Sequence, residues 1–352
     1  LRLSVMMFVG FMPLSFWFVT LGTYLGTNTG QAGNRLFSPG FIGIAYSTAA
    51  VGALFAPLVV GALADRLVPA ERLLVVLQLG SAGALVGLLS AESQSSFYWL
   101  LIAYFQCYIP TTSLAAAVAF HHLPHSTRQF AVVRMAGTAA WVVGGSFVGI
   151  LCPWLFGGSI EATTWPMRLA ILAHVLAAFY NLTLPRSSPG WQSSRPSIGG
   201  LLGLDALYLL RQRPIIVLLL ATTVLSVAVQ FYLSYANLYL NNLGIKRAAG
   251  KLAMGQVVEI FCILMLPAMI AKLGVKRTLL VGAASWLARY ALFAWGDADD
   301  HLWMLYVAIL LHGAAFTFVY ITSQIYINSA ADSSVRAAAQ GLFAMLSVGL
   351  GH

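Results

Sequence analysis

Charged residues are scarce in this chain. Only 8% of its 352 residues are Asp, Glu, Lys or Arg, whereas ordinary soluble domains carry about 25%. Hydrophobic residues make up 60%, and their long, uninterrupted runs do not show the alternation of a membrane β-barrel. The composition excludes an ordinary soluble domain and predicts an all-α protein that lies in a lipid bilayer.

Acidic residues are scarcer than basic ones, which gives a net charge of +9. The basic residues lie mostly in short loops and form no face interleaved with aromatics, so the charge does not indicate a nucleic-acid partner. No nucleophile elbow, phosphate-binding loop or pair of carboxylates placed for hydrolysis is present. We therefore expect a protein that is not an enzyme and that needs no cofactor.

Cysteines are also few, and the sequence offers no convincing metal site. The three cysteines lie in apolar segments without CxxC or zinc-type spacing, at Cys107, Cys152 and Cys262. His121, His122 and His125 are close in sequence, but Pro124 and a loop position argue against a formed site. We expect no bound metal.

Apolar segments long enough to cross a bilayer, about 20 residues each, are abundant. We predict ten complete spans, at residues 3–25, 40–63, 72–90, 97–120, 129–157, 165–184, 214–240, 250–271, 277–295 and 302–328. An eleventh begins near Arg336 and is still apolar at Gly351.

A polar connection at residues 185–213 divides the chain. It is rich in Ser, Pro and Gly, as linkers are, and contains an apolar stretch, 201–210, that can lie along the membrane interface. We predict an N-terminal six-helix half at 1–184, a cytoplasmic linker at 185–213, and a C-terminal half at 214–352.

A weak internal repeat supports this division. Pro57–Arg66 is similar to Pro267–Lys276, and Ser126–Arg128 is similar to Ser334–Arg336. Both pairs are about 210 residues apart, which suggests two parallel six-helix repeats as in transporters of the major facilitator type. On that basis the last one to two helices lie beyond this chain, although chance similarity between helix ends stays an alternative.

Lys and Arg predict the orientation, because cytoplasmic loops of membrane proteins are enriched in them. With the N-terminus in the cytoplasm, most of the 19 basic residues fall on the cytoplasmic side, among them Arg66, Arg72, Arg128, Lys272, Lys276 and Arg277. Fewer fall outside. The bias predicts a cytoplasmic N-terminus.

One acid lies deep within a span. Glu259 follows Gln256 by three residues in the segment 251–272, so both side chains share one helix face. A carboxylate in a membrane span costs at least about 2.5 kcal/mol and usually faces a cavity or a partner. We interpret Glu259 as the centre of a solute site. The alternative is a structural carboxyl, neutral or paired with an Arg such as Arg134.

The loop after the second span carries a possible conformational motif. Gly61, Asp65 and Arg66 fit the pattern G-x-x-x-D-R, which resembles the loop motif of the major facilitator superfamily. Gly61 allows close helix packing, and Asp65 can cap a neighbouring helix. The alternative is an ordinary charged turn.

Longer matches cover nearly the whole chain and resemble the nucleoside:proton symporter family of that superfamily. The most specific is W-x-x-R-x-A-L-F-A-x-G-D at 286–297, and others lie at 202–206, 274–276 and 334–343, with further agreement at 21–24, 45–47, 64–65, 108–111 and 134–138. The resemblance implies the major facilitator fold, two six-helix halves and a monomer.

The resemblance also implies a solute site. Its substrate-binding positions map onto Arg134, Thr138, Trp141, Gln230, Gln256, Glu259, Phe316 and Thr317. Polar groups of this kind suit ribose hydroxyls, and aromatic faces suit a base. Two positions depart from the family pattern: Leu233 replaces an Asn, and Thr317 replaces an Asp. Gln230 can alternatively join helices without touching a solute.

We therefore expect an inner-membrane importer that moves nucleosides with protons by alternating access. Substrate would lie between the fifth, seventh, eighth and tenth spans, and Glu259 would carry the proton. Two alternatives stay open. One is an uncoupled facilitator for nucleosides, sugars or related solutes, which Thr317 favours. The other is a truncated, non-transporting receptor or scaffold.

Overall fold

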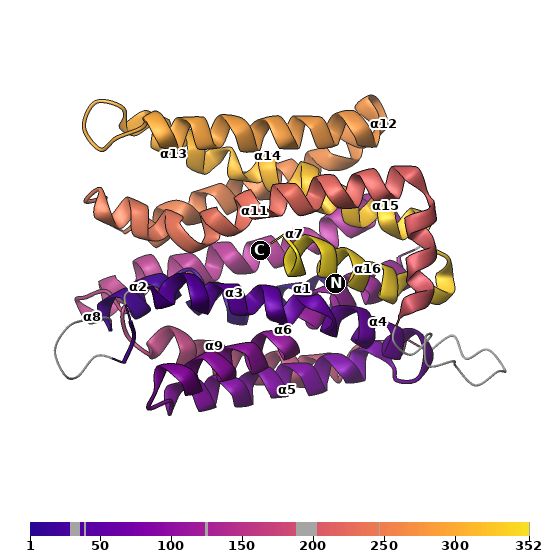
Figure 1. The fold of residues 1–352 in the computed structure, drawn as a ribbon, viewed down its shortest axis with the longest axis horizontal. Helices are drawn as coiled ribbons and strands as arrows, with labels where there is room; N and C mark the ends of the chain where they lie inside the picture. The colour runs from indigo at the N-terminus through magenta and orange to yellow at the C-terminus, as the bar shows by residue number, and fades with distance from the viewer. Residues whose placement is uncertain (29–35, 39, 124–125, 188–202, 246, 352) are drawn as a thin grey trace.

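The computed structural model describes residues 1–352 except 29–35, 39, 124–125, 188–202, 246 and 352. Within these ranges the regular elements are all helices, and the long ones lie roughly alongside one another (Figure 1). Most of the predicted linker, together with Pro124 and His125, lies outside the described residues.

The part of the chain before the 188–202 gap forms the helices α1 (Arg2–Trp17), α2 (Leu21–Thr27), α3 (Phe41–Leu54), α4 (Ala56–Arg66), α5 (Ala70–Leu89), α6 (Gln94–His122), α7 (Ser126–Ser146), η1 (Phe147–Leu151), α8 (Cys152–Phe156) and α9 (Trp165–Asn181). Some of these continue one another. Helices α1 and α2 form one membrane-length segment, α3 and α4 a second, and α7, η1 and α8 a third.

The part after the gap forms η2 (Leu204–Arg211), α11 (Arg213–Asn242), α12 (Ala248–Trp295), α13 (Leu302–Leu310), α14 (His312–Phe316), η3 (Thr317–Ile321), α15 (Thr322–Ala330), η4 (Ser333–Val335), α16 (Arg336–Ala344) and η5 (Met345–Gly349). Helix α12 is interrupted at Gly274, whose φ of 77° and ψ of 167° are not helical. A positive φ favours glycine, so α12 consists of two rods that meet between the predicted eighth and ninth spans.

Eight helices of the described chain are long and apolar enough to cross a membrane, judged by length and composition. Ten spans were predicted. The smaller number has two causes: α12 holds two predicted spans, and α9 has only 17 residues, the lower limit for a crossing of about 17–25.

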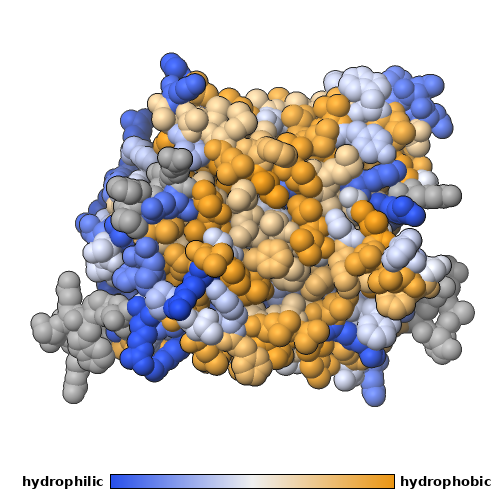
Figure 2. Space-filling view, turned by 180° about the vertical axis from the view of Figure 1, so that it is seen from behind, coloured by the Kyte–Doolittle hydropathy of each residue, from blue (hydrophilic) through white to orange (hydrophobic). Residues whose placement is uncertain are grey.

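The surface agrees with a membrane environment. Figure 2 shows a broad apolar band between two hydrophilic ends. On α11, Leu220, Val224 and Phe231 are 60% exposed or more. So large a continuous apolar surface would be costly in water but is suited to lipid.

Helix α4 packs closely against α16 at one end of the molecule. The Asp65 carboxylate accepts hydrogen bonds from the amides of Ala337 and Ala338, at 3.3 and 3.0 Å, in the first turn of α16. A carboxylate is favourable there because unpaired N–H groups and the helix dipole attract negative charge. Arg66 also pairs with Asp205 in η2. The residues of the predicted conformational motif thus contact the later part of the chain.

Glycines allow the helices to approach so closely. A Cβ at Gly61 would lie 2.5 Å from the carbonyl oxygen of Ala337, a distance that side chains essentially do not tolerate. At the opposite end, Thr23 donates to the Asn237 side chain at 3.2 Å, which joins α2 to α11. Contacts between early and late helices therefore occur towards both ends, and the site described next lies between them.

Candidate functional site

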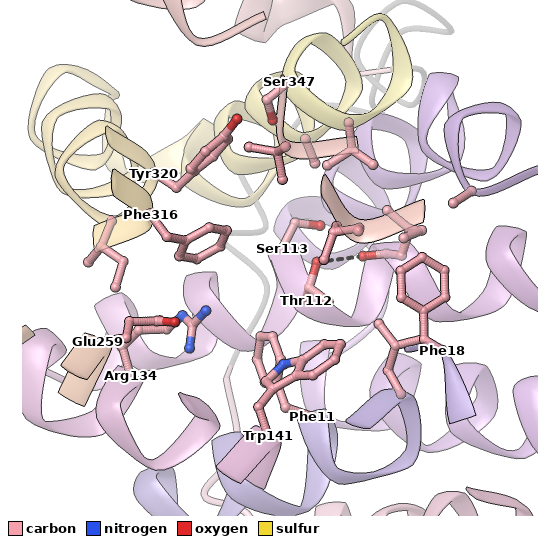
Figure 3. A pocket seen from close by; sticks show the side chains of 18 of the residues that line it. Phe11, Phe18, Thr112, Ser113, Arg134, Trp141, Glu259, Phe316, Tyr320 and Ser347 are labelled. Carbon is pink, nitrogen blue, oxygen red and sulfur yellow. Dashed lines mark hydrogen bonds between the residues drawn. The ribbon is translucent and has the colours of Figure 1, made fainter. Parts of the chain in front are cut away.

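A cavity of about 240 Å³ lies inside the helical assembly. Its wall includes residues from the early helices α1, α3, α6 and α7 and from the later α11, α12, α14, η3 and α16. This volume lies just below the roughly 300–1,000 Å³ that small-molecule sites usually enclose. Figure 3 shows Glu259 and Arg134 close together on one side of this space, with Thr112 and Ser113 on the other.

Glu259 occupies the charged side of the cavity. Its side chain, on α12, is buried, with the residue only 4% exposed. The Thr138 hydroxyl on α7 donates to Oε1 of Glu259 at 2.7 Å. In turn, Nη1 of Arg134 donates to the Thr138 hydroxyl at 3.3 Å. A short chain of hydrogen bonds thus connects Arg134 of α7 to Glu259 of α12 through Thr138.

Helix geometry explains this placement. Arg134 and Thr138 are four residues apart on α7, and Gln256 and Glu259 are three apart on α12, so each pair lies on one face. Gln256 lines the cavity with Glu259. Arg134 reaches the Glu259 carboxylate through the Thr138 hydroxyl.

His312 is a site residue that the sequence alone does not indicate. It begins α14, lines the cavity and places Nε2 at 3.6 Å from Oε2 of Glu259. Its Nδ1 lies 3.2 Å from Nη1 of Arg289. Because a single His in an apolar segment is most often a packing residue, its spacing along the chain gave no signal of a partner on another helix.

Aromatic rings form much of the remaining wall. Phe316 stacks between His312 and Tyr320, with ring centroids at 5.7 and 4.9 Å. Trp141 faces the cavity from α7 (Figure 3). The guanidinium of Arg134 lies 4.6 Å from the centre of the Phe11 ring, in cation–π geometry. A flat solute ring can therefore stack within reach of the charged groups.

Several neutral polar groups also line the cavity. Asn237 Nδ2 and Gln340 Oε1 are buried and have no hydrogen-bond partner among the described protein groups. An unpaired buried polar atom costs about 1–3 kcal/mol, so a solute or water that bonds to it is stabilised. Neither residue stands out in the sequence, since amides in membrane helices commonly join neighbouring helices.

Two predicted site residues lie elsewhere. Gln230 faces a separate hollow beside Tyr46 and Ser47 and donates to Ser234 at 3.1 Å, a bond within α11 that does not join two helices. Thr317 is fully buried at the start of the π-helical segment η3, and its hydroxyl has no partner.

Metal ligands do not gather in the described part of the chain. No group of three or more His, Cys, Asp or Glu residues is placed to hold an ion there. The three cysteines are free and distant from one another in sequence.

A family model for the nucleoside H+ symporter matches residues 1–352. The chain belongs to this family. The putative nucleoside transporter YegT of Escherichia coli K12 is 34% identical over 354 residues, which cover 99% of this chain and 81% of that protein. The xanthosine permease of the same organism is 27% identical, over 100% of this chain and 84% of that protein. These relatives are transporters and permeases by name, which confirms the predicted family and a transport protein in place of an enzyme.

Solved structures show the same fold for this nucleoside H+ symporter family member. The crystal structure of the nucleoside transporter NupG is similar with a TM-score of 0.74 and 23% identity, over 99% of this chain and 87% of that one. The xylose transporter XylE from E. coli gives 0.67 and 16%, over 99% and 91%. The predicted all-α membrane protein with a major facilitator fold is confirmed. The expected absence of the last one to two helices stays a prediction.

Proposed function

We propose that the chain imports nucleosides across the inner membrane together with protons, by alternating access. Family membership supports nucleoside transport. The observation that carries the proposal is the position of Glu259, a buried carboxyl at the cavity that bonds to Thr138 of α7 and faces His312 of α14. Intramembrane acids in such positions mark proton and substrate paths.

The cavity offers suitable partners for both parts of a nucleoside. Ribose hydroxyls can accept from Arg134 and donate to Glu259, while Gln256 offers both kinds of group. The base can stack on Phe316 or Trp141, a contact that contributes about 1–3 kcal/mol. Gln230 and Thr317 would reach the solute only after a movement of α11 or η3.

The position of the Glu259 carboxyl supports proton coupling. A proton that binds Glu259 removes its charge, which weakens the link from Thr138 on α7 to α12. Because those helices belong to the two predicted halves, 1–184 and 214–352, protonation and rocking of the halves are linked. Nucleoside and proton would enter from outside and leave to the cytoplasm, with a cytoplasmic N-terminus and a monomeric carrier.

The experiment is uridine uptake into proteoliposomes under an imposed inward proton gradient. Wild-type protein should accumulate uridine, and a protonophore should abolish the accumulation. Glu259→Gln should lose accumulation at least tenfold, because the amide cannot take up the proton. Glu92→Gln, at an exposed position, is the matched control and should transport normally. Undiminished uphill uptake by Glu259→Gln would exclude this role.

An uncoupled facilitator for nucleosides, sugars or related solutes is the second candidate. Thr317 favours it, since threonine is not titratable and stands where the family pattern has an Asp. In that case uridine would equilibrate across the liposome membrane without accumulating, and no alkalinisation of the medium would accompany uptake. A pH indicator outside the liposomes distinguishes the two functions.

A further inference from the structure

One face of the continuous segment α14, η3 and α15 runs along the cavity. Its side chains recur every four residues and all line the cavity, at His312, Phe316, Tyr320 and Gln324. The first three rings stack in succession, with centroid distances of 5.7 and 4.9 Å. Figure 3 shows Phe316 near Glu259 and Tyr320 farther from it on the same wall. A continuous aromatic strip therefore follows this wall.

The two ends of the strip differ in chemistry. At one end, His312 lies 3.6 Å from Glu259, among the charged groups of the candidate site. At the other end, Gln324 is half-buried and brings an uncharged amide to the cavity. The 12 residues from His312 to Gln324 cover roughly 18 Å at the rise of an α-helix. This is longer than a nucleoside, so a single solute does not touch both ends at once.

A second amide reaches the same end from α16. Gln340 lines the cavity and is only 1% exposed. Its Nε2 donates to the backbone carbonyl of Gln324 at 3.0 Å, which fixes the amide. Its Oε1 has no hydrogen-bond partner among the described groups. Because an unpaired buried acceptor is unfavourable, a solute donor that bonds to Oε1 is stabilised.

This end of the cavity lies beside the contact between α4 and α16. Ala338, whose amide donates to Asp65 at 3.0 Å, lies two residues before Gln340. Gly341 follows Gln340 directly and packs against the backbone of Pro57. The two amides therefore occupy the part of the cavity nearest the helices that must separate to release a solute at this end.

We propose that Gln324 and Gln340 form a second binding station, where a nucleoside stays after it leaves Glu259 and before α4 and α16 separate. This station rests on the proposed transport of nucleosides. A carboxamide offers both a donor and an acceptor, as the edge of a nucleobase does. On the way the base stays stacked, first on Phe316 and then on Tyr320. Neither amide titrates, so the station holds the solute with or without the coupling proton.

Photocrosslinking with 4-thiouridine tests where the base lies. The full chain in proteoliposomes is irradiated with this probe, and mass spectrometry identifies the labelled peptides. Two groups of adducts are expected, one near Glu259 and Phe316 and one on α15 and α16. An excess of uridine should suppress both groups, because both stations bind the same solute.

Gln324→Met and Gln340→Met keep the size of the side chain and remove its amide. Each should lower the adducts on α15 and α16 about fivefold, the size expected for one neutral hydrogen bond, and leave those near Glu259 in place. Gln106→Met is the matched control. Gln106 is half-buried in α6 and donates to the Val51 carbonyl at 3.3 Å, away from the residues that line the cavity. It should change neither group.

Adducts found only near Glu259, or adducts on α15 and α16 that Gln324→Met leaves unchanged, would overturn the second station. Gln324→Met is sufficient for the test if Gln340→Met does not fold, because Gln324 is half-buried. The two proposals fail separately. Both groups of adducts in a protein that transports no nucleoside would refute the proposed function and keep the station. Uridine accumulation with adducts only near Glu259 would do the opposite, and no adduct that uridine suppresses would refute both.

Discussion

The two oxygens of the Glu259 carboxyl face different helices. Oε1 accepts from Thr138 on α7 at 2.7 Å, while Oε2 faces His312 on α14 at 3.6 Å. A hydrogen bond to a charged group contributes about 1.5–3 kcal/mol. Neutralising this one carboxyl therefore changes its contacts to α7 and to α14 at once.

Thr138 provides a test at the level of a single hydroxyl. In Thr138→Val the donor to Glu259 and the acceptor for Arg134 are both lost, at nearly unchanged volume. We expect uridine kcat/KM to fall about tenfold, the size expected for one bond to a charged group. Thr138→Ser keeps the hydroxyl and should retain most of the activity. Equal activity of the Val and Ser variants would show that the bond does not contribute.

Residue spacing predicted part of this site. The pairs Arg134 and Thr138, and Gln256 and Glu259, could be placed on common faces because helical periodicity is a local property. His312 could not be selected, since its partners Glu259 and Arg289 belong to another part of the chain. Only the packing of α14 against α12 brings them together.

At the scale of elements, the contact of α4 with α16 holds one end of the cavity. Gly341 of α16 also faces the backbone of Pro57 without room for a side chain. Together with the Asp65 carboxylate on the first turn of α16, these contacts form only when the two helices touch. Alternating access requires that they separate in another conformation.

Gly61→Ala tests this contact. The added Cβ would lie 2.5 Å from the Ala337 carbonyl oxygen, and overpacking of this kind costs about 1–3 kcal/mol. The conformation with α4 against α16 should therefore be depleted about fivefold or more. Ser113 lines the cavity. A cysteine introduced at this position should therefore react faster with a thiol reagent added from the side of the membrane where α4 and α16 lie.

Gly83→Ala is the matched control, because Gly83 also lies in a membrane helix but has no neighbour within 4 Å of an added Cβ. It should leave the labelling rate of the Ser113→Cys protein unchanged. An equal rate for the Gly61 and Gly83 variants would contradict the role assigned to this helix contact.

The limits of the helices followed closely from composition, whereas their internal breaks did not. Charged and glycine residues mark the ends of apolar runs, so Lys272, Gly274 and Lys276 correctly separated the two rods of α12. The π-helical segments η1, η3 and η5 had no local signal. A π-helical turn contains one extra residue, and whether it forms depends on how the neighbouring helices pack.

For the whole molecule, the apolar band and its hydrophilic ends indicate the direction of the membrane normal (Figure 2). Gly274 and the basic residues around it lie at a break between two rods, as loops between spans do. Asp297, by contrast, is exposed, and hydrogen bonds from His301 lower its pKa to about 2. This loop stays negatively charged at physiological pH, which suits the outer side.

Orientation can be tested by cysteine labelling in intact cells. Asp299→Cys should react with a membrane-impermeant maleimide added outside, because we propose that its loop faces the periplasm. Lys276→Cys should react only after the membrane is permeabilised. The reverse pattern would invert the proposed topology, including the cytoplasmic N-terminus.

The proposed transport mechanism requires that Glu259 face a chamber that holds the nucleoside. The most direct measurement is an experimental structure of the full chain determined with uridine. It should show density between α7, α11, α12 and α14, with a ribose hydroxyl within hydrogen-bond distance of Glu259 or Arg134 and the base against Phe316 or Trp141. Uridine bound elsewhere, with the Glu259 carboxyl directed into lipid, would contradict the account.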